Sequence, residues 1–472
     1  MRKNKISFLN DGNGYNQPMI MLIALFFMWG FVTCMNDILI PHFKALFQLS
    51  YFEAMLVQFS FFGAYFIGSL AYFVISYVYK DPINVIGYKG GILLGLSLSA
   101  AGCFLFYPAA SIGIYGIFLF GLFVLGLGFT LLQISANAYV TLLGSTAGAS
   151  SRLNLAQGFN SLGTTLAPIL GGYLMFELFT GTTVDASGST GISYILFGLL
   201  FLLFATKIYF TKLPEFKSTS PIERGLGALA FPQLRAGIFG IFFYVGAEVA
   251  IGSFIISFIN EPDVLGAGEY IGKNYLALYW GGAMIGRFAG AIWLNGKIGV
   301  ARRIVFMIAA MASVFLLIYT LVDIPFGEVA YFLLFMLANC LIFMLSGSYS
   351  ARVLMFFALA NIALICCTIF GQGAWSLWSL IAVGLFNSVM WSNVFTLGIH
   401  GLGKHTGQGA SLLVMGILGG ALVPIMQGLL ADVVGLRQSF WIPGLCYVYV
   451  AVYGSMFIGK KKIVSDLAVR GH

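Results

Sequence analysis

Long apolar stretches, separated by short polar segments, run along almost the whole chain. Each stretch has about 20 residues or more, the length that an α-helix needs to cross the hydrocarbon core of a bilayer. An even number of such spans places both chain ends on one side of the membrane. We predict fourteen membrane-spanning helices, at residues 18–47, 51–79, 87–108, 112–143, 152–180, 191–211, 235–260, 273–296, 302–323, 328–347, 350–370, 374–400, 408–432 and 439–459.

The basic residues lie mainly in the gaps between these spans. If the loops alternate from a cytoplasmic start, only Lys44, Lys273 and Arg437 fall outside, and the other basic loop residues fall inside, as the positive-inside rule requires. Segment 1–17 is polar and basic and shows no cleavable signal peptide. We therefore expect a cytoplasmic tail at 1–17 and another at 460–472.

Composition supports an all-α polytopic membrane protein. Hydrophobic residues make up 60% of the chain and charged residues only 8%, against about 25% charged in a soluble domain. The net charge of +8 follows from the basic loops, so we expect no nucleic-acid partner. The six cysteines lie in apolar spans without metal-type spacing. Because no nucleotide loop, catalytic triad or metal cluster is visible, we expect neither an enzyme nor a cofactor.

The chain contains two related halves. Residues 26–30 (FFMWG) match 242–246 (FFYVG), and residues 63–68 (GAYFIG) match 281–286 (GGAMIG), at offsets of 216 and 218. Two later matches, around Asn137 and Asn393 and around Pro168 and Pro424, have an offset of 256. The second half therefore contains 38 extra residues, which is the length of two helices.

These repeats predict a domain organisation. Six helices at 18–211 form one bundle, a cytoplasmic linker follows at 212–234, and six helices at 235–459 form a second bundle with an inserted hairpin at 302–347. We expect the hairpin to be a peripheral, lipid-facing addition. Two parallel six-helix repeats are the architecture of the major facilitator superfamily, in which substrate binds at the midplane between the halves.

The first predicted span contains one formal charge, Asp37, beside Asn36. An ionisable side chain inside a membrane costs roughly 2.5–3.5 kcal/mol even on the lenient insertion scale, so it requires a partner or a water-filled path. We interpret Asp37 as the coupling carboxylate of a cation-driven transporter. The alternative is a carboxylate that only caps or links helices.

Further polar side chains share helix faces in the first half. Gln133 and Asn137 are four residues apart, and Gln157 and Asn160 are three apart. Amides can bind the hydroxyls of a sugar, and a carboxylate with amide oxygens suits an alkali cation. The alternative for each amide is a hydrogen bond that only joins two helices.

The second half supplies another carboxylate within a span, Glu248, on the same face as Tyr244. Glu248 is a sugar-hydroxyl acceptor, a second ionisable site or a structural partner of a buried donor. Arg287 lies near the cytoplasmic end of its span, where we expect it to clamp an inner gate. The residues that we expect to contact a sugar are Gln157, Asn160, Tyr244, Glu248, Asn274, Trp280, Asn387, Trp391 and Asn393.

Several of these segments resemble the fucose:proton symporter family. The matching strings are 36–41 (NDILIP), 51–54 (YFEA), 58–59 (QF), 62–66 (FGAYF), 152–163 (RLNLAQGFNSLG), 242–252 (FFYVGAEVAIG) and 279–288 (YWGGAMIGRF). The last two resemble most closely the bacterial glucose/galactose transporter branch. The resemblance implies the major facilitator fold, sugar uptake across a bacterial inner membrane, and coupling through Asp37.

One departure from the family concerns the coupling ion. The fucose permeases carry a glutamate at the position of Gln133, and a glutamine cannot release a proton. The glucose/galactose branch is associated with sodium coupling. Two further departures, at Ala138 and at 391–393, leave the sugar open among glucose, galactose, mannose and N-acetylglucosamine.

We therefore expect a sodium-coupled hexose importer that works as a monomer in the lipid bilayer. Asp37 and Gln133 are the expected sodium ligands, with Asn36 and Asn137 beside them. The first alternative is proton-coupled sugar symport, with Asp37 and Glu248 titrating. A second alternative is a sugar sensor or an embedded enzyme on a transporter scaffold.

Overall fold

The computed structural model describes residues 16–79, 82–143, 149–178, 186–211, 213–214, 227–294, 299–347, 349–402 and 406–458. Every regular element in these ranges is helical. The predicted tails at 1–17 and 460–472, and the predicted linker at 212–234, lie wholly or largely outside the described residues. The all-α class agrees with the hydrophobic pattern, because an unpaired strand edge cannot be satisfied inside a bilayer.

Among its described residues, the first half contains eight α-helices and two π-helical turns. They are α1 (Asn16–Phe47), α2 (Tyr51–Ala54), α3 (Leu56–Val78), α4 (Pro82–Phe104), α5 (Phe106–Ile112), α6 (Tyr115–Leu142), α7 (Ala149–Leu166), η2 (Ala167–Gly171), η3 (Leu174–Leu178) and α8 (Ala186–Phe210). The sharp turn after α1 is fixed by a capping box, in which Ser50 and Glu53 exchange hydrogen bonds between side chain and backbone.

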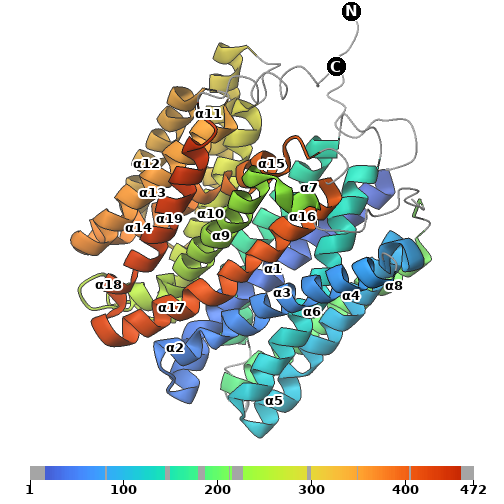
Figure 1. Cartoon of the computed structure of the whole chain (residues 1–472). Helices are drawn as coiled ribbons and strands as arrows, with labels where there is room; N and C mark the ends of the chain where they lie inside the picture. The colour runs from blue at the N-terminus through green and yellow to red at the C-terminus, as the bar shows by residue number, and fades with distance from the viewer. Residues whose placement is uncertain are drawn as a thin grey trace, which may run out of the picture.

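In the part of the second half that the structure describes, there are eleven α-helices and two short 3₁₀ turns. They are η4 (Gly227–Ala230), α9 (Pro232–Ile259), α10 (Glu269–Trp293), α11 (Val300–Tyr319), α12 (Phe326–Ser346), α13 (Ser350–Phe370), α14 (Gly373–Asn387), α15 (Met390–Ile399), α16 (Thr406–Met415), η6 (Gly416–Leu418), α17 (Gly419–Val434), α18 (Leu436–Ser439) and α19 (Trp441–Ser455). In Figure 1 the first half is blue to green and the second half is green to red, and the two lie side by side.

Eleven helical segments among the described residues are long and apolar enough to cross a membrane. They cover eleven of the fourteen predicted spans. The three others, at 152–180, 273–296 and 439–459, coincide with helices α7, α10 and α19, which lie outside this set. The chain is thus a multi-pass helical protein, and the count of fourteen stays a prediction.

The two halves repeat one close helix crossing. In the first half α1 crosses α7, and a Cβ atom on Gly163 would come within 2.1 Å of the Phe27 carbonyl oxygen. In the second half α9 crosses α17, and a Cβ atom on Gly419 would come within 1.8 Å of the Phe242 carbonyl oxygen. Only glycine allows the backbones to approach this closely. Gly163 and Gly419 are 256 positions apart, which is the later offset of the sequence repeat.

Helices α11 and α12 lie at the edge of the second half. Helix α13 packs against α14 and α19 in the way that α4 packs against α6 and α8, so α13 is the structural counterpart of α4. The α11–α12 pair instead packs on α10, α13 and α14 and exposes large apolar side chains, among them Val305, Leu316, Leu334 and Leu345. Figure 1 shows α11 and α12 on the side away from α4 and α8. The exact bounds of the two bundles and the hairpin stay a prediction.

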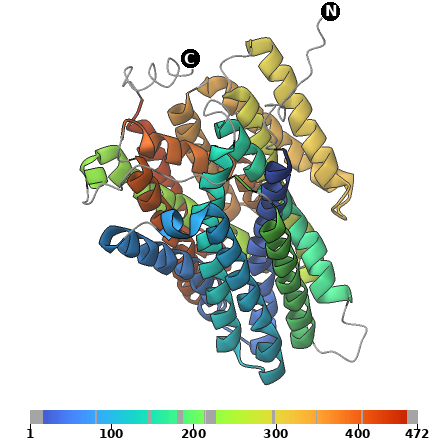
Figure 2. The same ribbon diagram turned by 90° about the vertical axis from the view of Figure 1, so that its right-hand side faces the viewer.

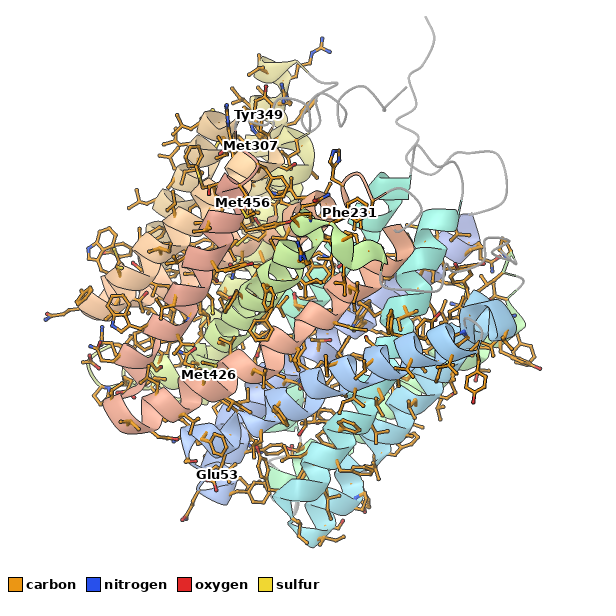
Figure 3. The ribbon with its side chains drawn as sticks, viewed as in Figure 1. Glu53, Phe231, Met307, Tyr349, Met426 and Met456 are labelled. Carbon is orange, nitrogen blue, oxygen red and sulfur yellow. The ribbon has the colours of Figure 1, made fainter. Side chains whose placement is uncertain are left out.

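The long helices extend from one end of the bundle to the other (Figure 2). Phe231, Tyr349 and Met456, at the start of α9, the start of α13 and the finish of α19, lie toward one end in Figure 3, and Glu53 lies at the other. The halves meet along a seam of α1, α3 and α7 against α9, α10 and α17. The side chains that face this seam determine which ligands could contact both halves.

Candidate functional site

Asp37 lies on α1 at the seam between the halves and is only 3% exposed. Its Oδ1 accepts hydrogen bonds from Gln58 Nε2 (2.9 Å) and Ser253 Oγ (3.1 Å). Its Oδ2 accepts from Trp280 Nε1 (3.0 Å), and the Cys34 thiol lies 3.7 Å away. These donors come from α1, α3, α9 and α10. We call Asp37, Gln58, Ser253 and Trp280 the seam cluster.

The seam cluster holds a carboxylate with neutral donors only. Among the described residues, no lysine or arginine forms an ion pair with Asp37, and the four bonded groups are an amide, a hydroxyl, an indole and a thiol. Hydrogen bonds from neutral donors stabilise a buried carboxylate without cancelling its charge. A mobile cation or a proton is therefore the species that can neutralise this group.

The other predicted ion ligands differ in their burial and in their hydrogen-bond partners. Asn36 is fully buried, and neither polar atom of its amide has a partner among the described residues. Asn137 Nδ2 donates to the backbone carbonyl of Gln133 (3.0 Å), and its Oδ1 is buried without a described partner. The Gln133 side chain is half-buried and is not among the hydrogen-bond partners of Asp37 in the described part of the chain.

The amide that contacts Asp37 is Gln58, which sequence reasoning quoted only as part of a family string. Its signal was present, because Gln58 is an amide in the interior of the second apolar span. Ser253 was missed altogether. A serine in a membrane span is common and most often bonds its own helix, so its position alone carries little information.

A second group of polar residues lies within the second half. Tyr244 donates to Glu248 Oε1 (2.7 Å), and Tyr279 donates to the Glu248 backbone carbonyl (2.8 Å). Asn387 then donates from Nδ2 to the Tyr279 hydroxyl (3.1 Å). All four side chains are buried, with Glu248 at 9% exposure.

Asn387 is the centre of this group. Its Oδ1 accepts hydrogen bonds from Tyr447 (2.8 Å) and from Asn361 Nδ2 (2.9 Å). The whole network thus joins α9, α10, α13, α14 and α19, all in the second half. We call it the second-half cluster, and its members are Tyr244, Glu248, Tyr279, Asn361, Asn387 and Tyr447. Sequence reasoning included Tyr244, Glu248 and Asn387, named Tyr279 only within a family string, and missed Asn361 and Tyr447, because partners far apart in sequence show no common spacing.

The two first-half residues expected to contact sugar differ in their surroundings. Asn160 Nδ2 donates to the backbone carbonyl of Phe26 (3.0 Å) and so joins α7 to α1. The Gln157 side chain is half-buried and makes no hydrogen bond among the described residues. Within the described part of the chain, the Gln157 amide and the Asn160 side-chain oxygen are therefore left for another group.

Three expected sugar contacts in the second half lie outside both clusters. Asn274 Oδ1 accepts from the backbone N–H of Asp323 (3.3 Å), in the turn between α11 and α12. Asn393 is buried, and its Nδ2 has no described partner. Trp391 stacks on Phe395, with ring centroids 6.2 Å apart. Their roles as sugar ligands stay predictions.

Arg287 bridges the halves at the level of α7. Its guanidinium Nη1 donates to the Ser161 hydroxyl of the first half, and its Nε donates to the Ser388 carbonyl of the second half (3.3 Å). The Phe288 ring would lie 3.4 Å from a Cβ atom on Gly158. This bridge is where a gate would be needed, and the gating role stays a prediction.

Asp432 bridges the halves at the opposite end. From α17, its Oδ1 accepts from the Tyr51 backbone N–H (2.9 Å) and its Oδ2 from the Phe52 backbone N–H (3.0 Å). It therefore caps the free N–H groups at the start of α2 across the seam, where a helix end favours a negative charge. The seam is joined on both sides of Asp37 along the bundle.

Comparison with known proteins places the chain among transporters. No family model matches it. It is 40% identical over 451 residues to the glucose/galactose transporter of Brucella abortus, covering 95% of each chain. It is 29% identical over 468 residues to the L-fucose-proton symporter of Escherichia coli, covering 94% of this chain and 93% of the symporter.

A solved transporter structure with a similar fold supports this placement. The structure of this chain matches the crystal structure of FucP, a major facilitator superfamily transporter in the outward conformation, with a TM-score of 0.64 and 28% identity. The match covers 94% of this chain and 99% of FucP. The chain therefore belongs to the fucose:proton symporter family of the major facilitator superfamily, and is a membrane transporter and not an enzyme.

Proposed function

We propose that this protein is a sodium-coupled hexose importer that works by alternating access in a bacterial inner membrane. The glucose/galactose transporter, at 40% identity over nearly the whole chain, supports the substrate class. The two joined halves support alternating access, because each half can move as a unit around a site between them.

The observation that carries the proposal is the position of Asp37. It is a buried carboxylate at the seam, bonded to neutral donors from both halves. A cation that binds Asp37 removes a buried charge and so changes the free energy of closing the two halves. If the same closure completes the sugar site, cation and sugar each raise the affinity of the other.

The choice of sodium is supported by the chemistry of the residues around Asp37. Amide and hydroxyl oxygens are hard ligands that suit an alkali cation. Gln133 stands where the fucose permeases carry a glutamate, and a glutamine cannot titrate. In this proposal Asp37 binds the ion, and Asn36, Gln133 and Asn137 supply polar surroundings.

Proton-coupled sugar symport is the second candidate, because one relative is a proton symporter of L-fucose. Asp37 and Glu248 are both buried carboxylates that could carry a proton. The two candidates share the same fold and sugar path and differ only in the species that neutralises Asp37.

The sugar path in this proposal runs along the seam. Trp280 bonds Asp37 directly and so links the ion to the sugar. Gln157 and Asn160 offer amide groups from the first half, and Glu248 and Asn387 belong to the polar cluster of the second half. Asn274, Trp391 and Asn393 remain candidate contacts. The transporter is expected to act as a monomer, with both termini in the cytoplasm.

Uptake of labelled glucose and galactose into proteoliposomes tests the proposal. We expect accumulation when an inward sodium gradient is imposed at equal pH on both sides. A proton gradient in sodium-free buffer should drive none. Accumulation under the proton gradient alone would identify a proton, and not sodium, as the coupling ion. Failure to transport any hexose under either gradient would reject the substrate class.

A further inference from the structure

Three polar atoms of the seam cluster form a small triangle. Gln58 Nε2 lies 2.9 Å from Asp37 Oδ1 and 2.8 Å from Ser253 Oγ, and Ser253 Oγ lies 3.1 Å from Asp37 Oδ1. All three side chains are at most 3% exposed. Two corners of the triangle are oxygens, and the third is the nitrogen of an amide that carries its own oxygen.

That amide oxygen is the unexplained atom. Gln58 Oε1 is buried and has no hydrogen-bond partner among the described residues. A buried acceptor without a partner is unfavourable, and native structures retain one mainly where something else binds. A half-turn about the last bond of the side chain exchanges Oε1 and Nε2 and moves no other atom.

After that half-turn, three oxygens face one point. Two of them are neutral and the third carries the charge of Asp37, so the set matches a single hard monovalent cation. Oxygens separated by about 3 Å can all reach the distances of about 2.3–2.6 Å at which hard cations such as Ca²⁺ bind. Without a cation, Oε1 would repel Asp37 Oδ1, so the amide keeps its present orientation.

We propose that Gln58 and Ser253 bind the coupling cation directly together with Asp37, and that Gln58 reverses its amide when the ion binds. The inference rests on the proposed sodium coupling and assigns its ligands. It replaces Gln133 by Gln58 as the amide ligand, because Gln58 contacts Asp37 and Gln133 does not among the described residues.

The ligand set also explains how ion binding acts on the halves. Asp37 and Gln58 lie on α1 and α3 of the first half, whereas Ser253 lies on α9 of the second. The three oxygens converge only when the halves are together at this level. A bound ion therefore stabilises the closed seam, and an empty site relies on the hydrogen bonds that Gln58 donates.

The test compares variants of the full-length transporter that separate a donor from an acceptor at position 58. Gln58→Met removes both groups, and Gln58→Glu keeps the size and supplies only oxygens. The measurement is the sodium concentration that half-saturates glucose uptake. If Gln58 is an ion ligand, Gln58→Met should raise the half-saturating sodium concentration about tenfold or more. Gln58→Glu should leave it equal to or below that of the unmodified protein.

A donor-only role gives the opposite pattern. If Gln58 serves only to donate to Asp37, Gln58→Glu with an ionised carboxylate should be at least as damaging as Gln58→Met, because the ionised group cannot donate and adds a second negative charge. That result would overturn the inference. An unchanged half-saturating concentration in both variants would overturn it as well.

Ser253 provides an independent pair, so misfolding of one variant leaves the test standing. Ser253→Ala removes the oxygen and should raise the half-saturating sodium concentration about tenfold. Ser253→Thr retains the hydroxyl and should stay within about threefold. Equal values for Ala and Thr would reject Ser253 as a ligand. Absence of any sodium response in the unmodified protein would instead reject the sodium coupling itself.

Discussion

The seam cluster and the second-half cluster are both buried polar networks, and they differ in which parts of the chain they join. The seam cluster joins α1 and α3 of one half to α9 and α10 of the other, so it must break or rearrange whenever the halves move apart. The second-half cluster joins helices of a single half, so it can move as a rigid unit.

This difference assigns separate tasks to two carboxylates with similar burial. Under the proposed function we expect Asp37 to respond to the relative position of the halves, because its donors come from both. Glu248 is bonded by residues of its own half, so we expect it to respond to what binds to that half. Coupling should therefore depend on the seam cluster, and sugar affinity and local stability on the second-half cluster. Substitutions in each cluster test this division.

The largest effect is expected for Asp37→Asn. The amide keeps the size of the side chain and removes the charge, so a cation no longer changes the free energy of closing the seam. Sugar accumulation driven by any ion gradient should be abolished, whereas exchange of labelled for unlabelled sugar across the liposome should persist. Asp323→Asn, at an exposed turn, is the matched control. Accumulation that survives in Asp37→Asn would remove Asp37 from the coupling role.

Glu248→Gln should produce the next largest effect, on sugar affinity. A hydrogen bond to a charged group is worth about 1.5–3 kcal/mol, so loss of the charge should weaken sugar binding about tenfold or more. The half-saturating sodium concentration should not change. Binding to purified protein and uptake at several sodium concentrations measure the two quantities.

The matched control for this variant is Glu261→Gln, a carboxylate beyond the end of α9 that makes no side-chain hydrogen bond among the described residues. Complete loss of gradient-driven accumulation in Glu248→Gln would contradict the division between the clusters. It would favour the proton-coupled alternative, in which Glu248 titrates.

Asn387→Leu should lower stability more than it changes coupling. The substitution leaves the hydroxyls of Tyr279 and Tyr447 and the amide of Asn361 each without one partner. Each such loss inside a membrane protein is worth about 0.6 kcal/mol on average, so a total of roughly 1–2 kcal/mol follows. Thermal unfolding in detergent should shift downward by a few degrees. A normal unfolding temperature would show that the network adds nothing to stability.

Tyr244→Phe should have the smallest effect. It removes only the hydroxyl that donates to Glu248 Oε1 and keeps the ring in place. A single such bond is worth about 0.6 kcal/mol, which corresponds to a roughly threefold change in sugar affinity. Equilibrium binding measures it. A loss as large as that of Glu248→Gln would mean that Tyr244 itself contacts the sugar.

The hydrophobic pattern was informative about the helices because the bilayer fixes the length of a span. It was less clear for three helices, of which α7 and α10 line the seam and α19 has only 15 residues. Helices α7, α10 and α19 were predicted as spans, yet they lie outside the eleven segments selected by length and hydropathy. Part of the reason is visible in α7, where Gln157, Asn160 and Ser161 replace apolar residues.

The functional site shows more clearly where prediction from the sequence ends. A charge inside an apolar span identified Asp37, because the cost of burying it demands an explanation. Spacing suggested that Gln133 and Asn137 share a face, and they do interact, but through the Gln133 backbone. Nothing in the spacing of Gln58 and Ser253, 195 positions apart, could show that both contact Asp37.

From the order of residues alone it follows that the chain crosses the membrane many times, that its halves are related, and that one buried carboxylate needs a partner. Those properties depend on burial cost and on local periodicity, which can be inferred from the order of residues. The packing of the helices showed which amide and which hydroxyl contact Asp37, and that Glu248 belongs to a separate network. The reason is geometric, because the rotation of each helix about its axis is set by packing against helices that are distant in sequence.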